Sequence, residues 1–151
     1  MTDATGPASA RELIDRSRYM TIATADADGR PWASPVWFAH EHYTDFLWVS
    51  RPGAQHSLNI KARAAVALVV FDSNVAPSAA QAVYVDAVAA EVGGDSLEHA
   101  IGVFAEKSLR TGLSDWIPAD VTGEAPHRLY RAHATASFVL ASNDRRVPVR
   151  L

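Results

Sequence analysis

The chain contains no cysteine, so a disulfide framework, a thiolate metal site and a cysteine nucleophile are all excluded. Hydrophobic residues make up 48% of the sequence, yet no apolar run is long enough to cross a bilayer. The N-terminal segment also lacks the apolar stretch behind a basic start that marks a secretory signal. We therefore expect a cytoplasmic protein with no membrane partner.

Positive charge is scarce as well. The formal net charge is -3 at pH 7, with both signs dispersed along the chain, and lysine occurs only at positions 61 and 107. No strongly basic face is available to meet a phosphate backbone. This charge pattern argues against nucleic acid as the main partner.

Motifs of strong catalytic specificity are missing too, including the nucleophile elbow, the P-loop, the dinucleotide-binding glycine pattern and the zinc-protease helix. His40 and His42 flank Glu41, and two histidines at this spacing can hold a metal ion. No third ligand stands at a convincing spacing, so we predict a solvated turn and no metal site. The residues alone identify no catalytic group.

A chain of 151 residues suits a single domain, which we assign to residues 1–151. A chain of this length buries roughly 70% of the surface that its unfolded form exposes, so it can form a core without cross-links. Residues 1–8 are small and polar, and we expect a flexible lead-in there. Ser9 is the predicted cap of a first helix that runs to Arg18.

Segments with strand patterns outnumber those with helical patterns. Asp28 and Gly29 provide the positive φ of a tight hairpin after the first strand. Hairpins of this kind and few helices favour an antiparallel sheet, so we predict a mainly β or α+β fold, a β-barrel with helical insertions. The expected strands are residues 19–25, 31–40, 46–50, 65–71, 81–92 and 127–141, and the helices are 9–18, 54–62 and 95–107.

Two strands carry further information. Pro31 and Pro35 cannot donate to a β-ladder, which predicts an edge strand or a bulge for residues 31–40. Residues 65–71 form an almost continuous apolar run, which predicts a strand covered on both faces. A small barrel filled by its own side chains has no room for a ligand inside, so a binding groove has to lie on its outer wall.

The segment from Ser50 to Asn59 is the richest in chemistry. Arg51 ends a strand, and His56 and Ser57 follow where a helix begins, whose free N–H groups and dipole favour an anion such as phosphate. The alternative is a polar turn in which Ser57 or Asn59 merely caps the helix and Arg51 is solvated. Both interpretations stay open at the level of residue chemistry.

Upstream, Ser34, Val36 and Trp37 combine a hydroxyl, a proline-interrupted ladder and an aromatic ring. Such a strand can present backbone polar groups to the edge of a flat ring while an aromatic side chain covers its face. An edge strand with core aromatics is the alternative, and the residues alone favour it.

Taken in order, these segments resemble the pyridoxamine 5'-phosphate oxidase-like family of flavin-binding proteins. The resemblance covers most of the chain, although each motif by itself is degenerate. It rests on Met20-Thr21-Ile22-Ala23-Thr24, Asp28-Gly29-Arg30-Pro31, Ser34-Pro35-Val36-Trp37, Leu47-Trp48-Val49-Ser50-Arg51, His56-Ser57-Leu58-Asn59-Ile60, Val66-Ala67-Leu68, Gln81-Ala82-Val83-Tyr84-Val85 and Arg128-Leu129-Tyr130-Arg131.

The resemblance implies a six-stranded antiparallel split barrel of the FMN-binding type. It also implies a homodimer with FMN at the subunit interface. Carried over by position, three residues would lie along the flavin ring and ribityl chain, four near its phosphate, and one would contact the flavin from either subunit. These are Ser34, Val36 and Trp37, then Ser50, Arg51, His56 and Ser57, and finally Gln81.

Two departures from the family pattern matter. His56 stands where the family often places a lysine or arginine, and its charge is weaker and depends on pH. The C-terminal arginine and histidine signature of the true oxidase is not intact. Only Arg128, Arg145 and Arg146 partly match it. We therefore do not expect this chain to oxidise the vitamin substrate of the true oxidase. It is more similar to related barrels that reduce other substrates, some of them with the deazaflavin F420.

The leading hypothesis is an FMN-dependent oxidoreductase that acts on a small conjugated substrate. The flavin supplies the reactive atom, which explains why no acid–base pair stands out. Trp37 or Trp116 could stack on the open face of the ring, although a large aromatic is more often part of the core. The alternatives are an F420-dependent reductase of the same fold and a non-catalytic module that binds flavin or haem.

Overall fold

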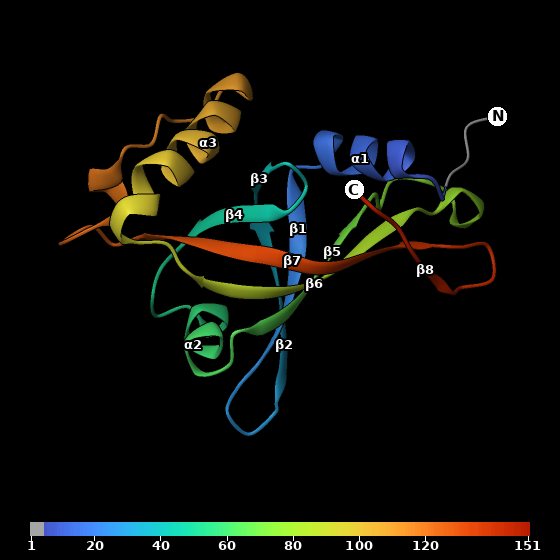
Figure 1. Ribbon diagram of the computed structural model, residues 1–151, viewed down its shortest axis with the longest axis horizontal. Coiled ribbons are helices and arrows are strands. Elements are labelled where there is room, and N and C mark those ends of the chain that lie inside the picture. Colours follow the sequence, from blue (N-terminus) through green and yellow to red (C-terminus); the bar gives the residue numbers. More distant parts are fainter. Residues whose placement is uncertain (1–4) are drawn as a thin grey trace.

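The computed structural model describes residues 5–151, which form one curled antiparallel sheet with helices packed around it (Figure 1). In chain order the elements are α1 (Pro7–Arg16), β1 (Tyr19–Ala25), β2 (Pro31–Trp37), β3 (Ala39–Glu41), β4 (Asp45–Ser50), α2 (Gln55–Ala62), β5 (Ala65–Phe71), β6 (Ala82–Glu91), α3 (Leu97–Arg110), β7 (Arg128–Leu140) and β8 (Arg146–Pro148). Three short 3-10 turns, Pro77–Ala79, Gly94–Ser96 and Pro118–Val121, lie in the connections.

The strands follow one another in the sheet as β2-β1-β5-β6-β7-β4-β3, and β8 pairs with β7. The predicted antiparallel split barrel with helical insertions is confirmed, and β2 lies at an edge, as its prolines predicted. The strand count differs from the six expected, because the predicted strand 31–40 divides into β2 and β3 and the C-terminal tail adds β8.

Phe38 explains the division of that strand. Trp37 is still paired with Tyr19 of β1, whereas Ala39 is paired with Leu47 of β4. Between them the Phe38 N–H donates to the Arg18 carbonyl at 3.2 Å, and the Phe38 side chain is fully buried. The chain therefore changes its partner strand at this residue, which a run of apolar residues cannot reveal.

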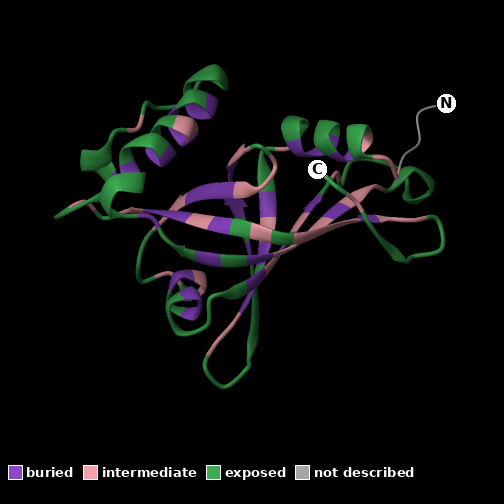
Figure 2. Ribbon diagram, viewed as in Figure 1, coloured by how far each residue is buried: buried purple, intermediate pink, exposed green. Residues whose placement is uncertain are grey.

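The barrel interior is filled by side chains of the sheet and of α1. Its largest buried members include Trp48, Phe38 and Phe46, and α1 adds Leu13 and Ile14. A second, smaller apolar cluster lies between α3 and the other face of β4, and Figure 2 shows buried residues along the side of α3 that faces the sheet. The interior thus has no space for a ligand, as expected for a small barrel.

The prediction that residues 65–71 are covered on both faces is wrong. In β5, Val66, Leu68 and Val70 point inward, whereas Ala65 and Phe71 are exposed on the other face. The strand covered on both faces is β4, which has side chains in both apolar clusters. An apolar outer face on β5 is therefore left uncovered within one chain.

The first helix begins at Pro7, two residues before the predicted cap at Ser9, and Gly6 is its N-cap. Proline is favoured in the first helical turn because its missing N–H would have no partner there. Residues 1–4 of the expected lead-in lie outside the described residues. Among residues 5–151, no helix is long and apolar enough to span a membrane.

Trp48 provides a test of the core. Its side chain is fully buried and stacks on Tyr130 with ring centroids 5.7 Å apart. We expect Trp48→Ala to lower the free energy of unfolding by about 3–5 kcal/mol, measured by urea denaturation, because it opens a large cavity. Trp32→Ala is the matched control: Trp32 is 50% exposed, and its replacement should cost far less. Equal losses in the two variants would contradict this description of the core.

Candidate functional site

A cavity of about 490 Å³ lies outside the barrel, where the ends of β2 and β4 meet α2, α3 and the segment that follows α3. Its size falls in the range of small-molecule sites. The lining residues are Pro35, Val36, Trp37, Val49, Ser50, His56, Phe104, Ser108, Leu113, Ser114, Trp116 and His127. Four of the predicted site residues, Val36, Trp37, Ser50 and His56, therefore share one cavity.

Hydrogen bonds join the polar residues at one end of this cavity. The two ring nitrogens of His56 contact two hydroxyls: Nε2 lies 2.8 Å from Ser50 Oγ, and Nδ1 lies 3.3 Å from Ser34 Oγ. Trp32 Nε1 donates to Ser34 Oγ at 2.9 Å. The residues come from β2, β4 and α2, so the fold brings together side chains 22 and 6 positions apart along the chain.

Trp32 is a fixed donor in this chain of hydrogen bonds. An indole N–H can only donate, so Ser34 Oγ accepts from Trp32. When the Ser34 hydroxyl donates to His56 Nδ1, the ring proton of neutral His56 lies on Nε2 and is donated to Ser50 Oγ. In this arrangement the Ser50 hydroxyl keeps its proton for a ligand in the cavity.

Burial lowers the pKa of His56 below its ordinary value of 6.5, because the cavity wall removes water that would stabilise the imidazolium. The ring is therefore neutral in the free protein at neutral pH. An anion bound against His56 would reverse this effect, since a nearby negative charge favours the protonated ring.

The start of α2 is suited to an anion for a second reason. No side chain caps the helix at Ala54, so the N–H groups of its first turn have no side-chain acceptor. Arg51 lies in the turn just before the helix and is exposed; its carbonyl accepts from the Ala54 N–H at 3.0 Å, but its side chain makes no hydrogen bond or ion pair with residues 5–151. A free cation and free N–H groups thus lie beside His56.

Ser57 and Asn59 do not cap the helix, so this part of the alternative interpretation is wrong, whereas Arg51 is exposed, as the alternative expected. Asn59 is 2% exposed; its Nδ2 donates to Thr24 Oγ1 at 3.0 Å, and its Oδ1 accepts from Gln55 Nε2 at 2.8 Å. The Asn59 side chain thereby links α2 to β1 through a hydrogen bond. Ser57 is buried and lines a different cavity of about 660 Å³ next to Tyr130, so it lies apart from the His56 cluster.

Aromatic rings form the other end of the first cavity. Trp37 contacts Phe104 edge-to-face with centroids 5.1 Å apart, and Phe104 contacts Trp116 in the same way at 5.8 Å. Trp116 in turn lies 6.1 Å from His127. Trp37 and Trp116 were among the expected stacking residues, whereas Phe104, Ser108, Leu113 and His127 were not predicted for this cavity. For Phe104, the sequence pattern indicated only a position on the buried face of a predicted helix.

Gln81 lies far from this cavity within the same chain. It precedes β6 at the end where Ala82 pairs with Phe71, whereas the other end of β6 pairs with Tyr130, near the Ser50–Arg128 pair. The ten residue steps from Gln81 to Glu91 span about 30 Å at the usual strand rise. A role for Gln81 at this cavity therefore requires a second copy of the chain.

The histidines next to Glu41 have separate partners. His40 Nε2 lies 2.8 Å from Asp15 Oδ1, while the His42 side chain is 88% exposed and lies 3.9 Å from Glu41. Glu41 also contacts His99 at 2.6 Å. Among residues 5–151 no group of three or more histidine, aspartate or glutamate side chains is arranged to hold a metal ion.

The lowered pKa of His56 has a consequence for stability. The unfolded chain binds a proton on this ring near pH 6.5, whereas the folded chain resists it, so stability should fall as the pH drops below about 6.5. His40, whose pKa burial also lowers, contributes with the same sign. We expect His56→Gln to flatten this decline in urea denaturation curves measured from pH 7 to 5. His42→Gln, at an exposed position, should not; identical profiles for all three proteins would contradict the prediction.

Comparisons with known proteins agree with this fold. A family model described as pyridoxamine 5'-phosphate oxidase matches residues 7–141. The crystal structure of HutZ, the haem storage protein from Vibrio cholerae, is 24% identical and covers 88% of this chain and 93% of that one, with a TM-score of 0.70. No curated protein sequence matches the chain.

Two further solved structures have other descriptions. One, described as an F420 reductase, is 23% identical, covers 87% of this chain and 97% of that one, and has a TM-score of 0.63. The other is an FAD-binding protein from Mesorhizobium loti, 18% identical over 89% of this chain and 93% of that one, with a TM-score of 0.64. At these identities the likeness to solved structures shows the fold alone.

Proposed function

Because the chain belongs to the pyridoxamine 5'-phosphate oxidase family, we propose that it is a flavoprotein that binds FMN and oxidises or reduces a small conjugated substrate. One observation supports the proposal above the others: Ser34, Ser50 and His56 meet at a cavity that also has an aromatic wall. FMN has this same division between a phosphate end and a flat ring.

The residues present fit the phosphate end. A phosphate near His56 would accept a hydrogen bond from the Ser50 hydroxyl and would favour the charged form of the ring. The Arg51 side chain has no hydrogen-bond or ion-pair partner among the described residues and could turn toward the same anion. Hydrogen bonds in which both partners are charged are about twice as strong as neutral ones. Ser57 would contribute only through its backbone N–H, because its side chain lines the other cavity.

The residues also fit the flat ring. Val36 and Trp37 come from the end of the edge strand β2, and Phe104 and Trp116 face them from α3 and the segment beyond it. This wall would exclude water from one side of the ring and fix its orientation. Bound FMN would supply the electron and hydride transfer, so the chain's own residues bind and orient.

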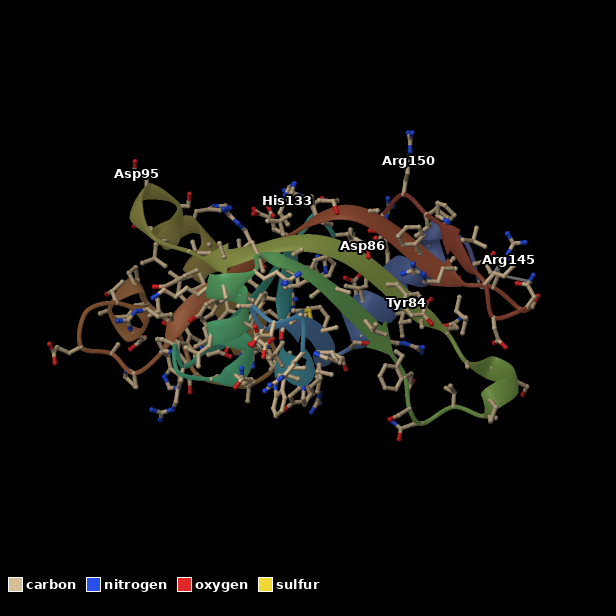
Figure 3. The ribbon with its side chains drawn as sticks, turned by 90° about the horizontal axis from the view of Figure 1, so that it is seen from below. Tyr84, Asp86, Asp95, His133, Arg145 and Arg150 are labelled. Atoms are coloured by element: carbon tan, nitrogen blue, oxygen red, sulfur yellow. The ribbon has the colours of Figure 1, made fainter. Side chains whose placement is uncertain are left out.

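A homodimer is part of the proposal. The outer sheet face, formed by Thr21, Ala23, Ala67, Val69, Phe71, Tyr84 and Val88, carries mostly apolar side chains from three adjacent strands. Phe71 and Val88 are each 51% exposed on it. Asp86 and His133 project from the same side of the sheet (Figure 3). An apolar patch of this kind marks an interaction site, and a second copy would bring its own Gln81 toward the cavity.

Titration of the purified protein with FMN tests the proposal. We expect quenching of flavin fluorescence, a rise in melting temperature, and tighter binding of FMN than of riboflavin, because only FMN carries the phosphate. If FMN neither loses fluorescence nor raises the melting temperature, the proposal is wrong.

The alternatives are decided by parallel titrations. The likeness to an F420 reductase supports a deazaflavin in the same cavity, and the likeness to a haem storage protein supports a binding module without turnover. A clear preference for F420 over FMN would favour the first. Haem binding, or flavin binding without oxidation of a nicotinamide donor in the presence of an electron acceptor, would favour the second.

A further inference from the structure

The cavity of about 660 Å³ that Ser57 lines takes no part in the proposed flavin site. It lies on another side of α2 from His56, where Ser57, Ile60 and Lys61 share one face of the helix. The last residues of β6 and Tyr130 of β7 form the facing wall. We call this space the second cavity.

The second cavity has a mainly apolar lining and a buried floor. Four of its lining residues are 4% exposed or less and therefore form the floor: Ser57, Ile60, Ala89 and Tyr130. The charged members, Lys61 and Glu91, are exposed and lie at the mouth. The remaining members are Pro52, Gly53, Leu58, Ala64 and Ala90. No charged side chain is therefore part of the floor.

Two polar atoms beside this floor have no partner. Among residues 5–151, Ser57 Oγ and Trp48 Nε1 are buried side-chain polar atoms that make no hydrogen bond. Trp48 stacks on Tyr130 with ring centroids 5.7 Å apart, and Ser57 lines the floor next to Tyr130. Buried polar groups in folded proteins are nearly always hydrogen-bonded. The unpaired Ser57 hydroxyl therefore calls for a partner that enters the cavity.

Tyr130 supplies a second hydroxyl at the same place. Burial raises the pKa of its phenol above the ordinary value of 10.0, and the nearby Ser57 hydroxyl partly offsets this. The phenol is therefore uncharged at neutral pH. The two hydroxyls are neighbours, but Ser57 Oγ does not meet the phenol in hydrogen-bond geometry. Each hydroxyl can donate and accept, so a third hydroxyl placed between them can pair with both.

The charges around the second cavity do not select an ion. Lys61 and Glu91 have opposite signs at the mouth, and Glu91 also lies 3.5 Å from Arg128. A charged group on the floor would lose its hydration against Ile60 and Ala89 without meeting an opposite charge. An apolar body, by contrast, gains by leaving water for this lining. The lining thus favours an uncharged ligand.

We propose that the second cavity binds a small, uncharged and mainly apolar molecule that carries one hydroxyl group, with a simple phenol as its model. The ligand hydroxyl pairs with Ser57 and Tyr130 on the floor, and the apolar body packs against Ile60, Ala89 and the apolar rim. Binding involves no covalent step. The site lies outside the proposed flavin site and does not depend on it.

Titration of the full chain with p-cresol, followed by nuclear magnetic resonance, tests the proposal. Toluene is the control ligand, because it has the same ring and methyl group without the hydroxyl. Ser57→Ala and Tyr130→Phe each remove one floor hydroxyl and keep most of the side-chain shape. We expect each variant to weaken p-cresol binding about fivefold and to leave toluene binding nearly unchanged, because only p-cresol loses a hydrogen bond.

Two further variants locate the ligand. Ala90→Phe, at an exposed position in the lining, places a ring in the second cavity and should weaken p-cresol binding about tenfold or more. Ala80→Phe is the matched control: Ala80 is also exposed, but it precedes the other end of β6 and does not line this cavity. It should leave p-cresol binding unchanged.

Several outcomes would overturn the proposal. One is the lack of a saturable shift at the Leu58 and Lys61 amides, which would mean that water alone occupies the cavity. The others are an equal effect of Ser57→Ala on the two ligands, and equal p-cresol binding by the Ala90→Phe and Ala80→Phe variants. If Tyr130→Phe does not fold, Ser57→Ala decides alone. These titrations contain no added flavin, so their failure and the failure of FMN binding are separate results.

Discussion

Replacing Arg51 and His56 together by alanine is expected to weaken FMN binding by about 100-fold or more and to leave riboflavin binding nearly unchanged. The reason is the charge on the ligand. A hydrogen bond to a charged group contributes about 1.5–3 kcal/mol, and the double variant removes two such partners of the phosphate. Riboflavin has the same ring without the phosphate, so fluorescence titration with both ligands separates loss of the phosphate contact from general damage.

Arg63→Ala is the matched control for this experiment. Arg63 follows the other end of α2 and contacts the Ala27 carbonyl at 3.4 Å, away from the cavity. Its loss should affect neither ligand. Equal weakening of FMN and riboflavin in the double variant would show that Arg51 and His56 do not contact the phosphate. The single variants should rank with His56 first, since it lines the cavity and Arg51 lies in the exposed turn beside it.

Val69→Lys is expected to convert the proposed dimer into monomers. Val69 lies near the middle of the outer sheet face, opposite Thr21 on one side and Tyr84 on the other. An ammonium group placed there would lose its hydration on dimerisation, which costs several kcal/mol, and Asp86, which lies diagonally opposite on the same face, would offset only part of this cost. We expect the dissociation constant of the dimer to rise about 100-fold or more in analytical ultracentrifugation.

The control for this charge change is Leu109→Lys. Leu109 is 54% exposed on α3, away from the outer sheet face, so the same change should leave the dimer intact. The Val69 site is partly exposed in the single chain, and the melting temperature of the monomer should therefore change little. A wild-type protein that sediments as a monomer would contradict the proposed dimer itself.

Local patterns were enough to predict most elements of the sheet, with β3 and β8 as the exceptions. The turn at Asp28 and Gly29 forms the hairpin between β1 and β2, with Gly29 at a φ of +84°, and the two prolines predicted the edge position of β2. The error in the first helix was a shift of its start and its end by two residues each. Turns, edge prolines and helix ends depend on residues that are close together in the chain, so a single sequence is enough to predict them.

Coverage of a strand face is not a local property. The apolar run 65–71 has the composition of a strand buried on both faces, but whether a helix lies over it depends on where α3 packs. In this chain α3 covers β4 instead, with Leu47 and Ile101 in the same apolar cluster. For the same reason the aromatic wall of the first cavity was only half predicted, because Phe104 and Leu113 reach it through tertiary packing.

The candidate site was predicted better than its individual roles. The resemblance pointed to Ser34, Ser50 and His56, and the structure brings these three together. Ser57 follows His56 in the chain, but successive helical side chains point in different directions, and it lines another cavity.

The position of β7 between β6 and β4 determines when the sheet can be completed during folding. Strand β4, which carries Ser50, has its long pairing partner in β7, where Asp45 lies opposite His133, 88 positions later. Closing so long a loop is slow compared with forming a hairpin. During synthesis the hairpins β1–β2 and β3–β4 can form early, whereas β4 gains its longer partner only after β7 has been made. The cavity beside His56 is thus completed among the last steps of folding, although Ser50 and His56 come from the first half of the chain.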